Sequence, residues 1–211
     1  MRETIRERIR EIEQEHHVRV LYACESGRRA WGMSSGGEEF DVRFLYLRPR
    51  SWYLSVEDRQ EILEAAGHGG SEINGWDVRR ALRLFLKSNA ALCEWLHSPI
   101  VYQESGDVVG LWRSLVPDIL SPRVLAASYA GLAKGIWAGA LRGDSVRVVA
   151  YLYALRSLFA ARWITQRRSL PPVRLTELRA GCEVSAAVDE RLEALLATNR
   201  SSAAGCTVRR D

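Results

Sequence analysis

The sequence predicts an α+β protein, with a small mixed sheet near the N-terminus and a helical half that packs on it. Two runs rich in β-branched and aromatic residues, VRVLYA at 18–23 and FDVRFLYL at 40–47, are typical of buried strands. After residue 77 the apolar residues recur at helical spacing, as in VRRALRLFLKSN. The chain has 211 residues, 47% of them apolar, so it is long enough to bury a substantial core.

Short strands and helices are predicted to alternate through the N-terminal half. Residues 2–15 place three isoleucines on one helical stripe among charged neighbours, which indicates an amphipathic helix. The elements that follow are a strand at 18–23, a short helix in RRAWGM, a strand at 40–47, a helix at 56–66 and a third short strand in HGGSEINGW.

The second half is predicted to be helical throughout. Asp77 is a suitable N-cap for a helix that begins at Val78, and a second helix, AALCEWLHS, is stopped by Pro99. The later helices are predicted at 123–141, 146–166 and 186–197. We therefore expect an α+β domain over 1–88, a helical domain over 89–198 and a flexible tail over 199–211.

Composition and charge exclude few functions. The net charge of +4 is slight, but Lys87 and Lys134 are the only lysines among 30 basic residues. An arginine-rich chain suits anionic ligands, although a compositional bias of the genome explains it equally simply. The four cysteines lie far apart, which favours reduced, buried thiols over a metal site. The charged N-terminus does not resemble a signal peptide, and the apolar run at 124–141 is too short to span a bilayer, so we expect a cytoplasmic protein without a membrane partner.

Two carboxylates are predicted to share one face of the strand at 40–47. Side chains alternate along a strand, so Glu39, Asp41 and Arg43 project together while Phe40 and its alternate neighbours face the core. Adjacent carboxylates repel each other unless a cation compensates them, and Mg²⁺ prefers such oxygen ligands. The solvated face of an edge strand is the other interpretation, and the pattern alone does not separate the two.

A turn that could bind phosphate precedes these acids. Ser26 and Gly27 open a short helix directly after a strand, where backbone N–H groups attract anions. Such a turn followed by a carboxylate pair is the arrangement that nucleotidyl transfer needs, because metal ions there bind the triphosphate and activate a hydroxyl. Glu72 is the best-placed third carboxylate; Asp77 is second, but its capping role already explains it.

Several basic residues are candidate nucleotide contacts. Arg28 and Arg43 could bind phosphates, and Arg43 could equally neutralise the acids beside it. Lys87 ends a predicted helix, where a cation also suits the helix dipole, so a nucleotide contact is one of two interpretations.

The stretches ESGRRAWG, EEFDVRFLYLRP and EINGWDVRRALRLFLKSN resemble the nucleotidyltransferase superfamily of DNA polymerase β. They are most similar to its branch in bacteria and phages, some of whose members are encoded beside RNA-repair ligases. LCEWLHSPIVY, YLYALRSLFAARWI and PPVRLTEL continue the resemblance, which covers residues 2–198. It implies that 1–88 is a nucleotidyltransferase-like catalytic domain built on a small mixed sheet with flanking helices.

The resemblance also implies an activity and a site. It implies transfer of a nucleoside monophosphate from an NTP substrate to a hydroxyl, with Mg²⁺ or Mn²⁺ as cofactor. It assigns Gly27 to the phosphate-binding turn, Glu39 and Asp41 to the metal, and Glu72 to the third acid. The acceptor is expected to be RNA or another polynucleotide end; a protein hydroxyl is the alternative.

Several residues depart from the family pattern, among them two of the candidate site residues. Arg28 stands where the family usually has Ser, and Glu39 where it usually has Asp. The extra methylene moves the Glu39 carboxylate by about 1.5 Å, which is large for octahedral Mg²⁺ coordination. A nucleotide- or RNA-binding protein with weakened catalysis is therefore the alternative function. The residues do not indicate an oligomeric state.

Overall fold

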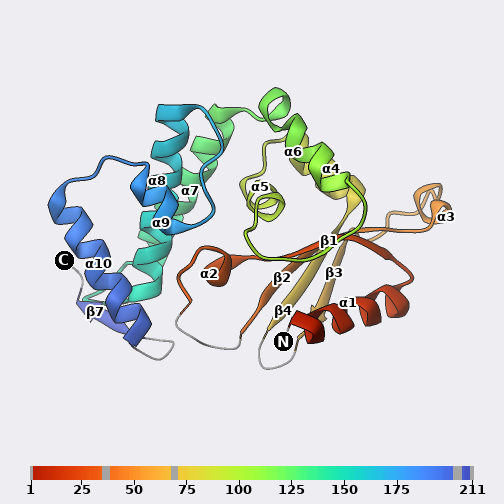
Figure 1. Cartoon of the computed structure of the whole chain (residues 1–211), viewed down its shortest axis with the longest axis horizontal. Helices are drawn as coiled ribbons and strands as arrows, with labels where there is room; N and C mark the ends of the chain where they lie inside the picture. Colours follow the sequence, from red (N-terminus) through yellow and green to blue (C-terminus); the bar gives the residue numbers. More distant parts are fainter. Residues whose placement is uncertain (1, 35–38, 68–70, 202–205, 210–211) are drawn as a thin grey trace. The chain divides into compact units, whose positions relative to one another are not determined.

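A computed structural model of the chain describes residues 2–34, 39–67, 71–201 and 206–209. The chain forms two compact units (Figure 1). The first unit comprises Met1–Ala30 and Glu38–Leu120, and the second comprises Trp31–Gly37 and Ser121–Asp211. A short segment near the N-terminus thus belongs to the unit that is otherwise built from the C-terminal half.

A five-stranded sheet forms the centre of the first unit, which confirms the predicted mixed sheet and adds two strands to the three expected. The strand order is β3-β4-β2-β1-β5. The bounds are β1 (Arg19–Glu25), β2 (Asp41–Leu47), β3 (Ile62–Ala66), β4 (Glu72–Asp77) and β5 (Val101–Glu104). β2 and β4 run parallel, whereas β1 pairs antiparallel with β2 and β5, and β3 with β4.

Helices cover both faces of this sheet (Figure 1). On one face α1 (Arg2–His16) buries its three isoleucines, the stripe predicted from the sequence, against Val42 and Phe44 of β2. The other face carries α4 (Val78–Leu86), α5 (Ala90–Leu96) and α6 (Val108–Ile119). The alternation predicted for β2 is therefore confirmed, because its even-numbered residues lie in the core with α1.

The predicted helix at 56–66 is wrong. The structure places only the four-residue α3 (Arg50–Tyr53) nearby, and residues 62–66 form β3, which pairs antiparallel with β4. Leu63 is buried while Glu64 is exposed, an alternation that suits an edge strand. Pairing with β4 supplies the backbone hydrogen bonds that a helix would have made internally.

The first unit continues to Leu120, beyond the boundary that we expected at residue 88. Strand β5 pairs with β1, so this later segment completes the sheet. Helix α6 packs Val109 and Trp112 into the same core as Tyr22 of β1. Long-range sheet pairing, which local periodicity does not report, therefore sets the boundary.

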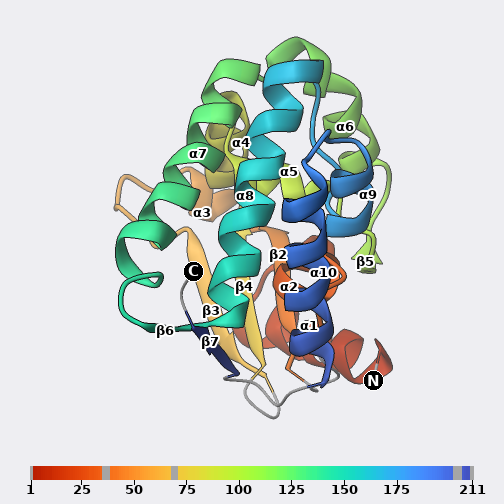
Figure 2. The ribbon, with the colours of Figure 1, turned by 90° about the vertical axis from the view of Figure 1, so that its left-hand side faces the viewer.

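The second unit is a helical bundle with a small two-stranded sheet (Figure 2). Its helices are α7 (Pro122–Gly139), α8 (Val148–Arg167), α9 (Leu175–Ala180) and α10 (Ala186–Ser201). Strands β6 (Ser145–Arg147) and β7 (Thr207–Arg209) pair antiparallel. The expected tail at 199–211 thus includes the end of α10 and a paired strand; residues 202–205 and 210–211 lie outside the described part.

Arg156, in the middle of α8, organises the centre of the second unit. Its side chain is 2% exposed, and it donates to the Val173 carbonyl oxygen from Nε at 3.4 Å and from Nη2 at 3.2 Å. The guanidinium lies over the Trp31 ring, 4.2 Å from its centroid. The Trp31 carbonyl in turn accepts from the backbone N–H of Leu175 at 2.9 Å. The segment that follows the predicted phosphate turn is therefore held within the helical unit.

The expectation of reduced, buried thiols holds for three of the four cysteines. The four cysteines are free thiols; Cys24, Cys93 and Cys182 are buried, whereas Cys206 is partly exposed. Within the described ranges, no helix is both long and apolar enough to cross a membrane.

Candidate active site

Asp41 and Glu72 lie side by side at the start of the two parallel strands. They are direct register partners in the β2–β4 ladder, and the backbone N–H of Glu72 donates to the Phe40 carbonyl at 2.8 Å. Both residues project to the face opposite the α1 core, because their neighbours Val42 and Ile73 point into that core. The pairing therefore brings together two of the three carboxylates that we predicted.

Arg43 joins these two carboxylates. Its Nε lies 2.5 Å from Asp41 Oδ1, and its Nη2 donates to Glu72 Oε2 at 3.1 Å. Arg43 is two residues after Asp41 on β2, so both side chains lie on the same face. One guanidinium thus compensates two adjacent negative charges, the neutralising role that the sequence left open for Arg43.

Glu39 is not part of this group. It lies before the start of β2, and its Oε2 accepts from Nη2 of Arg28 at 3.1 Å. The Glu39 side chain is 59% exposed. Where the chain is described, no three His, Cys, Asp or Glu side chains are placed to hold a metal ion together. The expected convergence of three acids is therefore reduced here to the Asp41–Glu72 pair.

Gly27 packs its backbone against the Asp41 carboxylate. It opens the four-residue α2 (Gly27–Ala30) with φ +58°, and a Cβ at this position would lie 2.7 Å from Asp41 Oδ2. The N–H of Ser26 donates to the Asp41 carbonyl at 2.7 Å. Because that N–H is already paired, Ser26 can contact a phosphate only through its hydroxyl. The glycine is required here for close approach to an acid as well as for the turn.

Glu25 is a site residue that our sequence reasoning missed. It is fully buried at the end of β1, and its Oε1 accepts from the Asp41 N–H at 3.1 Å. Its Oε2 accepts from the Tyr102 hydroxyl at 2.5 Å, and Arg29 Nε lies 3.5 Å from Oε1. Glu25 opens the motif ESGRRAWG, but only the distant Tyr102 makes its role visible. This carboxylate fixes the backbone that carries Asp41.

Burial shifts the pKa of two carboxyls of the site, Asp41 and Glu25. Burial raises the pKa of the Asp41 carboxyl; the Arg43 guanidinium opposes the shift and the Glu72 charge adds to it. Burial likewise raises the pKa of Glu25, although the Tyr102 hydroxyl and the Asp41 N–H oppose this. Each carboxylate therefore needs a cation or hydrogen-bond donors to remain ionised.

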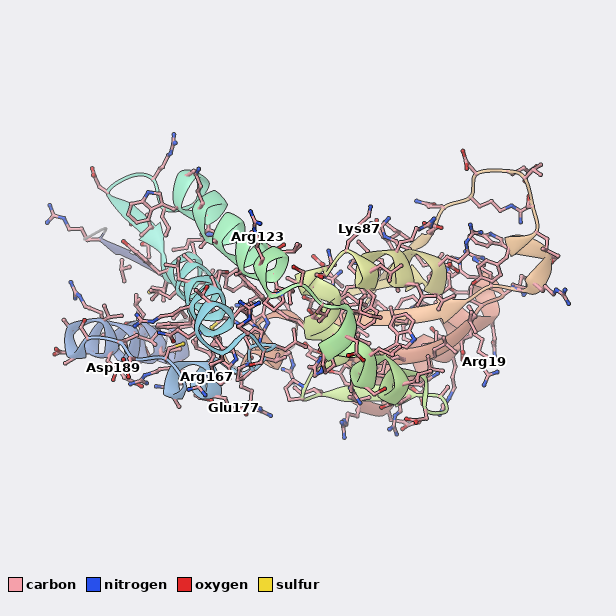
Figure 3. All side chains as sticks on the ribbon, turned by 90° about the horizontal axis from the view of Figure 1, so that it is seen from above. Arg19, Lys87, Arg123, Arg167, Glu177 and Asp189 are labelled. Atoms are coloured by element: carbon pink, nitrogen blue, oxygen red, sulfur yellow. The ribbon has the colours of Figure 1, made fainter. Side chains whose placement is uncertain are left out.

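Lys87 belongs to the first unit. It is the C-cap of α4, where its backbone N–H donates to the carbonyls of Arg83 and Leu84. Its exposed side chain projects from the end of the helix (Figure 3). This placement fits the helix-terminal role that the sequence offered as the alternative to a nucleotide contact.

The donor set beside Arg43 fits a divalent cation in part. Asp41 Oδ1 is buried, and no donor in the described ranges makes a hydrogen bond of acceptable geometry to it, even though the Arg43 charge is close. Such an oxygen beside a second carboxylate is a hard ligand pair of the kind that Mg²⁺ uses with substrate phosphates. Asp41 and Glu72 therefore suit Mg²⁺ if a bound triphosphate supplies the remaining ligands.

Replacing Gly27 by Ala is expected to disturb the site. An alanine at this position must keep the positive φ, which costs about 1–2 kcal/mol. Its Cβ also collides with the Asp41 carboxylate, which adds about 1–3 kcal/mol. Gly32→Ala is the matched control, because Gly32 has φ +75° and its Cβ would meet no described atom within 4 Å. Urea unfolding measures both. Equal losses for the two variants would show that the Gly27–Asp41 contact is not required.

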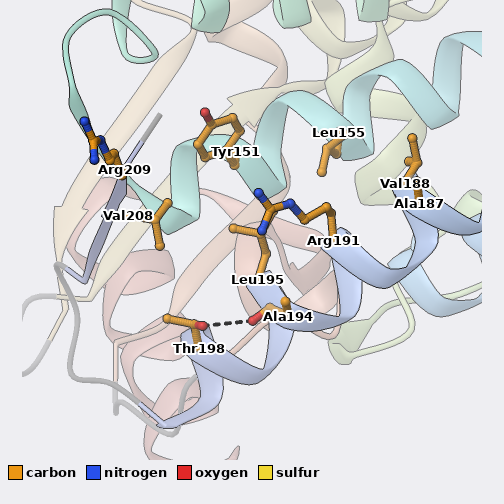
Figure 4. Close-up of a pocket in the computed structure, with 10 residues that line it drawn as sticks. All are labelled: Tyr151, Leu155, Ala187, Val188, Arg191, Ala194, Leu195, Thr198, Val208 and Arg209. Atoms are coloured by element: carbon orange, nitrogen blue, oxygen red, sulfur yellow. Dashed lines mark hydrogen bonds between the residues drawn. The ribbon is translucent and has the colours of Figure 1, made fainter. Parts of the chain in front are cut away.

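The second unit holds a separate pocket of about 650 Å³ between α8, α10 and β7 (Figure 4). Apolar side chains dominate its lining, with Tyr151 on α8, Arg191 on α10 and Arg209 on β7 as its larger polar members. None of the residues that we predicted for the site lines this pocket, so the carboxylate pair and the pocket are different features.

The chain matches one family model and one curated protein, and one solved structure aligns with it weakly. The model of a family described as "RNA repair pathway DNA polymerase beta family", RlaP, matches residues 1–208. The uncharacterized protein YcgL of Bacillus subtilis (strain 168) is 36% identical over 197 residues, which cover 92% of this chain and 76% of YcgL. A solved structure of a nucleotidyltransferase-like protein from Exiguobacterium sibiricum 255-15 aligns at 14% identity and a TM-score of 0.34. That alignment covers 91% of this chain but only 63% of the solved chain, so this chain spans less than two thirds of its length.

Proposed function

The chain belongs to the RNA repair pathway DNA polymerase beta family, and on this premise we propose that it transfers a nucleoside monophosphate from an NTP to a hydroxyl. We further propose that the acceptor is an RNA end or another polynucleotide end. The observation that carries the proposal is the Asp41–Glu72 pair at the start of two parallel strands, held at close range by Arg43.

Each charged group of the site has a role in the proposed reaction. Asp41 and Glu72 would hold Mg²⁺ or Mn²⁺, which when bound neutralises phosphate charge and activates the attacking hydroxyl. Glu72, whose side chain is 68% exposed, is the carboxylate open to an incoming acceptor, and it orients the acceptor hydroxyl. Arg28 and Arg43 bind the triphosphate through their planar donor forks. Glu25 keeps the Asp41 backbone in place by accepting a hydrogen bond from its N–H.

The proposal is tested by incubating the protein with each of the four α-labelled NTPs, Mg²⁺ or Mn²⁺, and an RNA or protein acceptor. We expect a labelled RNA that gains one or more nucleotides, with pyrophosphate released. If only protein becomes labelled, the acceptor is a protein hydroxyl and not RNA. No labelled acceptor with any NTP, in the presence of either metal, would contradict the transferase.

A second function is favoured by a specific observation: Arg28 pairs with Glu39, and among the residues that the structure describes only Asp41 and Glu72 remain together. A protein that binds NTP or RNA on this fold without turning it over would use the same arginines. It predicts that Asp41→Asn leaves NTP affinity unchanged and that wild-type protein labels no acceptor. The transferase predicts a labelled acceptor with wild-type protein and strongly reduced labelling with the variant.

A further inference from the structure

Arginine side chains hold every carboxylate that we assigned to the metal site. Arg28 pairs with Glu39, and Arg43 pairs with both Asp41 and Glu72. Arg43 contacts both members of the Asp41–Glu72 pair, with Nε 2.5 Å from Asp41 Oδ1 and Nη2 3.1 Å from Glu72 Oε2. A metal ion that bound those oxygens would therefore compete with the Arg43 guanidinium for the same position.

We propose that Arg43 acts as a built-in cation that keeps the metal site closed until a triphosphate binds. The inference rests on the proposed function, since it concerns the same NTP and the same carboxylates. In the nucleotide-free protein Arg43 neutralises Asp41 and Glu72. When a triphosphate arrives, the guanidinium transfers its hydrogen bonds to phosphate oxygens, and the carboxylates are released to a divalent cation.

The chemistry of both partners favours this exchange. Guanidinium binds phosphate through two parallel charge-assisted hydrogen bonds, a geometry at least as favourable as its contact with carboxylate. In the present contacts the guanidinium reaches each carboxylate through one nitrogen, Nε to Asp41 and Nη2 to Glu72. The exchange therefore gives up two single contacts and forms a bidentate one.

The Arg43 side chain is 20% exposed, so a ligand in solution can reach part of it. Removing Arg43 leaves two like charges side by side without compensation, which raises their demand for another cation. Metal and nucleotide binding are therefore coupled, and by linkage each must strengthen the other.

The coupling is measured by titrating Mn²⁺ into the chain and following free Mn²⁺ by electron paramagnetic resonance. Wild-type protein is expected to bind Mn²⁺ weakly alone, and about tenfold or more tightly with a non-hydrolysable NTP analogue. Arg43→Gln is expected to bind Mn²⁺ about tenfold more tightly than wild type without nucleotide, and to gain little from the analogue. Circular dichroism shows whether the variants are folded.

Two further variants make the result specific. Arg59→Gln removes another arginine that pairs with a carboxylate, Glu57 at 3.0 Å, and should leave Mn²⁺ affinity at the wild-type value. Adding Asp41→Asn to Arg43→Gln should abolish the gained affinity, because the gain is assigned to Asp41. If Arg43→Gln binds Mn²⁺ no more tightly than wild type without nucleotide, the inference is wrong.

The inference and the proposed function fail differently. An unchanged Mn²⁺ affinity in Arg43→Gln, together with normal labelling of RNA by wild-type protein, overturns only the role of Arg43. Absence of labelling by wild-type protein, together with tighter Mn²⁺ binding in Arg43→Gln, overturns the transferase but leaves the competition between arginine and metal intact.

Discussion

Asp41→Asn is expected to lower the rate of nucleotide transfer on the order of 10²–10³-fold, the scale seen when a group that stabilises transition-state charge is removed. Asparagine has nearly the same shape, so the register with Glu72 and the hydrogen bond from Asp41 N–H to Glu25 should persist. What is lost is one negative charge on the buried oxygen Oδ1, the proposed metal ligand. Steady-state kinetics with labelled NTP measure the effect.

Asp58→Asn is the matched control, because Asp58 is exposed in the segment before β3 and should give wild-type rates. Urea unfolding of both variants separates a catalytic loss from a folding defect. Transfer by Asp41→Asn at more than half the wild-type rate would remove Asp41 from the mechanism.

Arg156→Met is expected to destabilise the second unit by about 2–4 kcal/mol. Methionine fills much of the same volume, but it donates no hydrogen bond to the buried Val173 carbonyl and places no cation over Trp31. A buried acceptor that loses its donor carries the full desolvation penalty. Thermal and urea unfolding measure the loss.

Arg162→Met is the control for this change, since Arg162 is exposed on the same helix. It should change stability by less than about 0.5 kcal/mol, the usual range for surface substitutions. Arg156→Lys keeps the charge without the planar fork, and its loss of stability should fall between those of Arg156→Met and Arg162→Met. If Arg156→Met and Arg162→Met unfold together, Arg156 does not anchor the Trp31 segment.

The features that were predicted correctly involve residues close to one another in the sequence. The alternation along β2 and the isoleucine stripe of α1 were read from residue spacing alone, and the structure confirms both. Asp77 likewise caps α4 as predicted, with its carboxylate accepting from the N–H of Arg79 at 2.8 Å. These features need only the neighbours within one strand or one turn of helix.

Features that depend on distant pairing were not visible in the sequence. Residues 62–66 became a strand because β4 offers them an edge, and α6 joins the first unit because β5 closes the sheet. Glu25 was not singled out, since its burial depends on Tyr102, which lies 77 residues later. Long-range contacts of this kind leave little local signal.

The candidate site was predicted in its residues more than in its contacts. The alternation of β2 and the family resemblance pointed to Asp41 and Glu72, and strand pairing makes them neighbours. Arg28 pairs with Glu39, and Arg43 pairs with Asp41 and Glu72. These ion pairs depend on side-chain rotamers, which residue spacing does not predict. The departures at residues 28 and 39 thus compensate each other as an ion pair.

A crystal structure of the chain with Mn²⁺ and a non-hydrolysable NTP analogue would show whether Asp41 and Glu72 bind the metal, because Mn²⁺ is located by its anomalous scattering. We expect an anomalous peak at coordination distance, about 2.0–2.2 Å, from oxygens of Asp41 and Glu72. We also expect that the triphosphate completes the coordination and that Arg43 contacts a phosphate. A nucleotide bound elsewhere, or one bound without metal while Arg43 still joins Asp41 to Glu72, would contradict the proposed site.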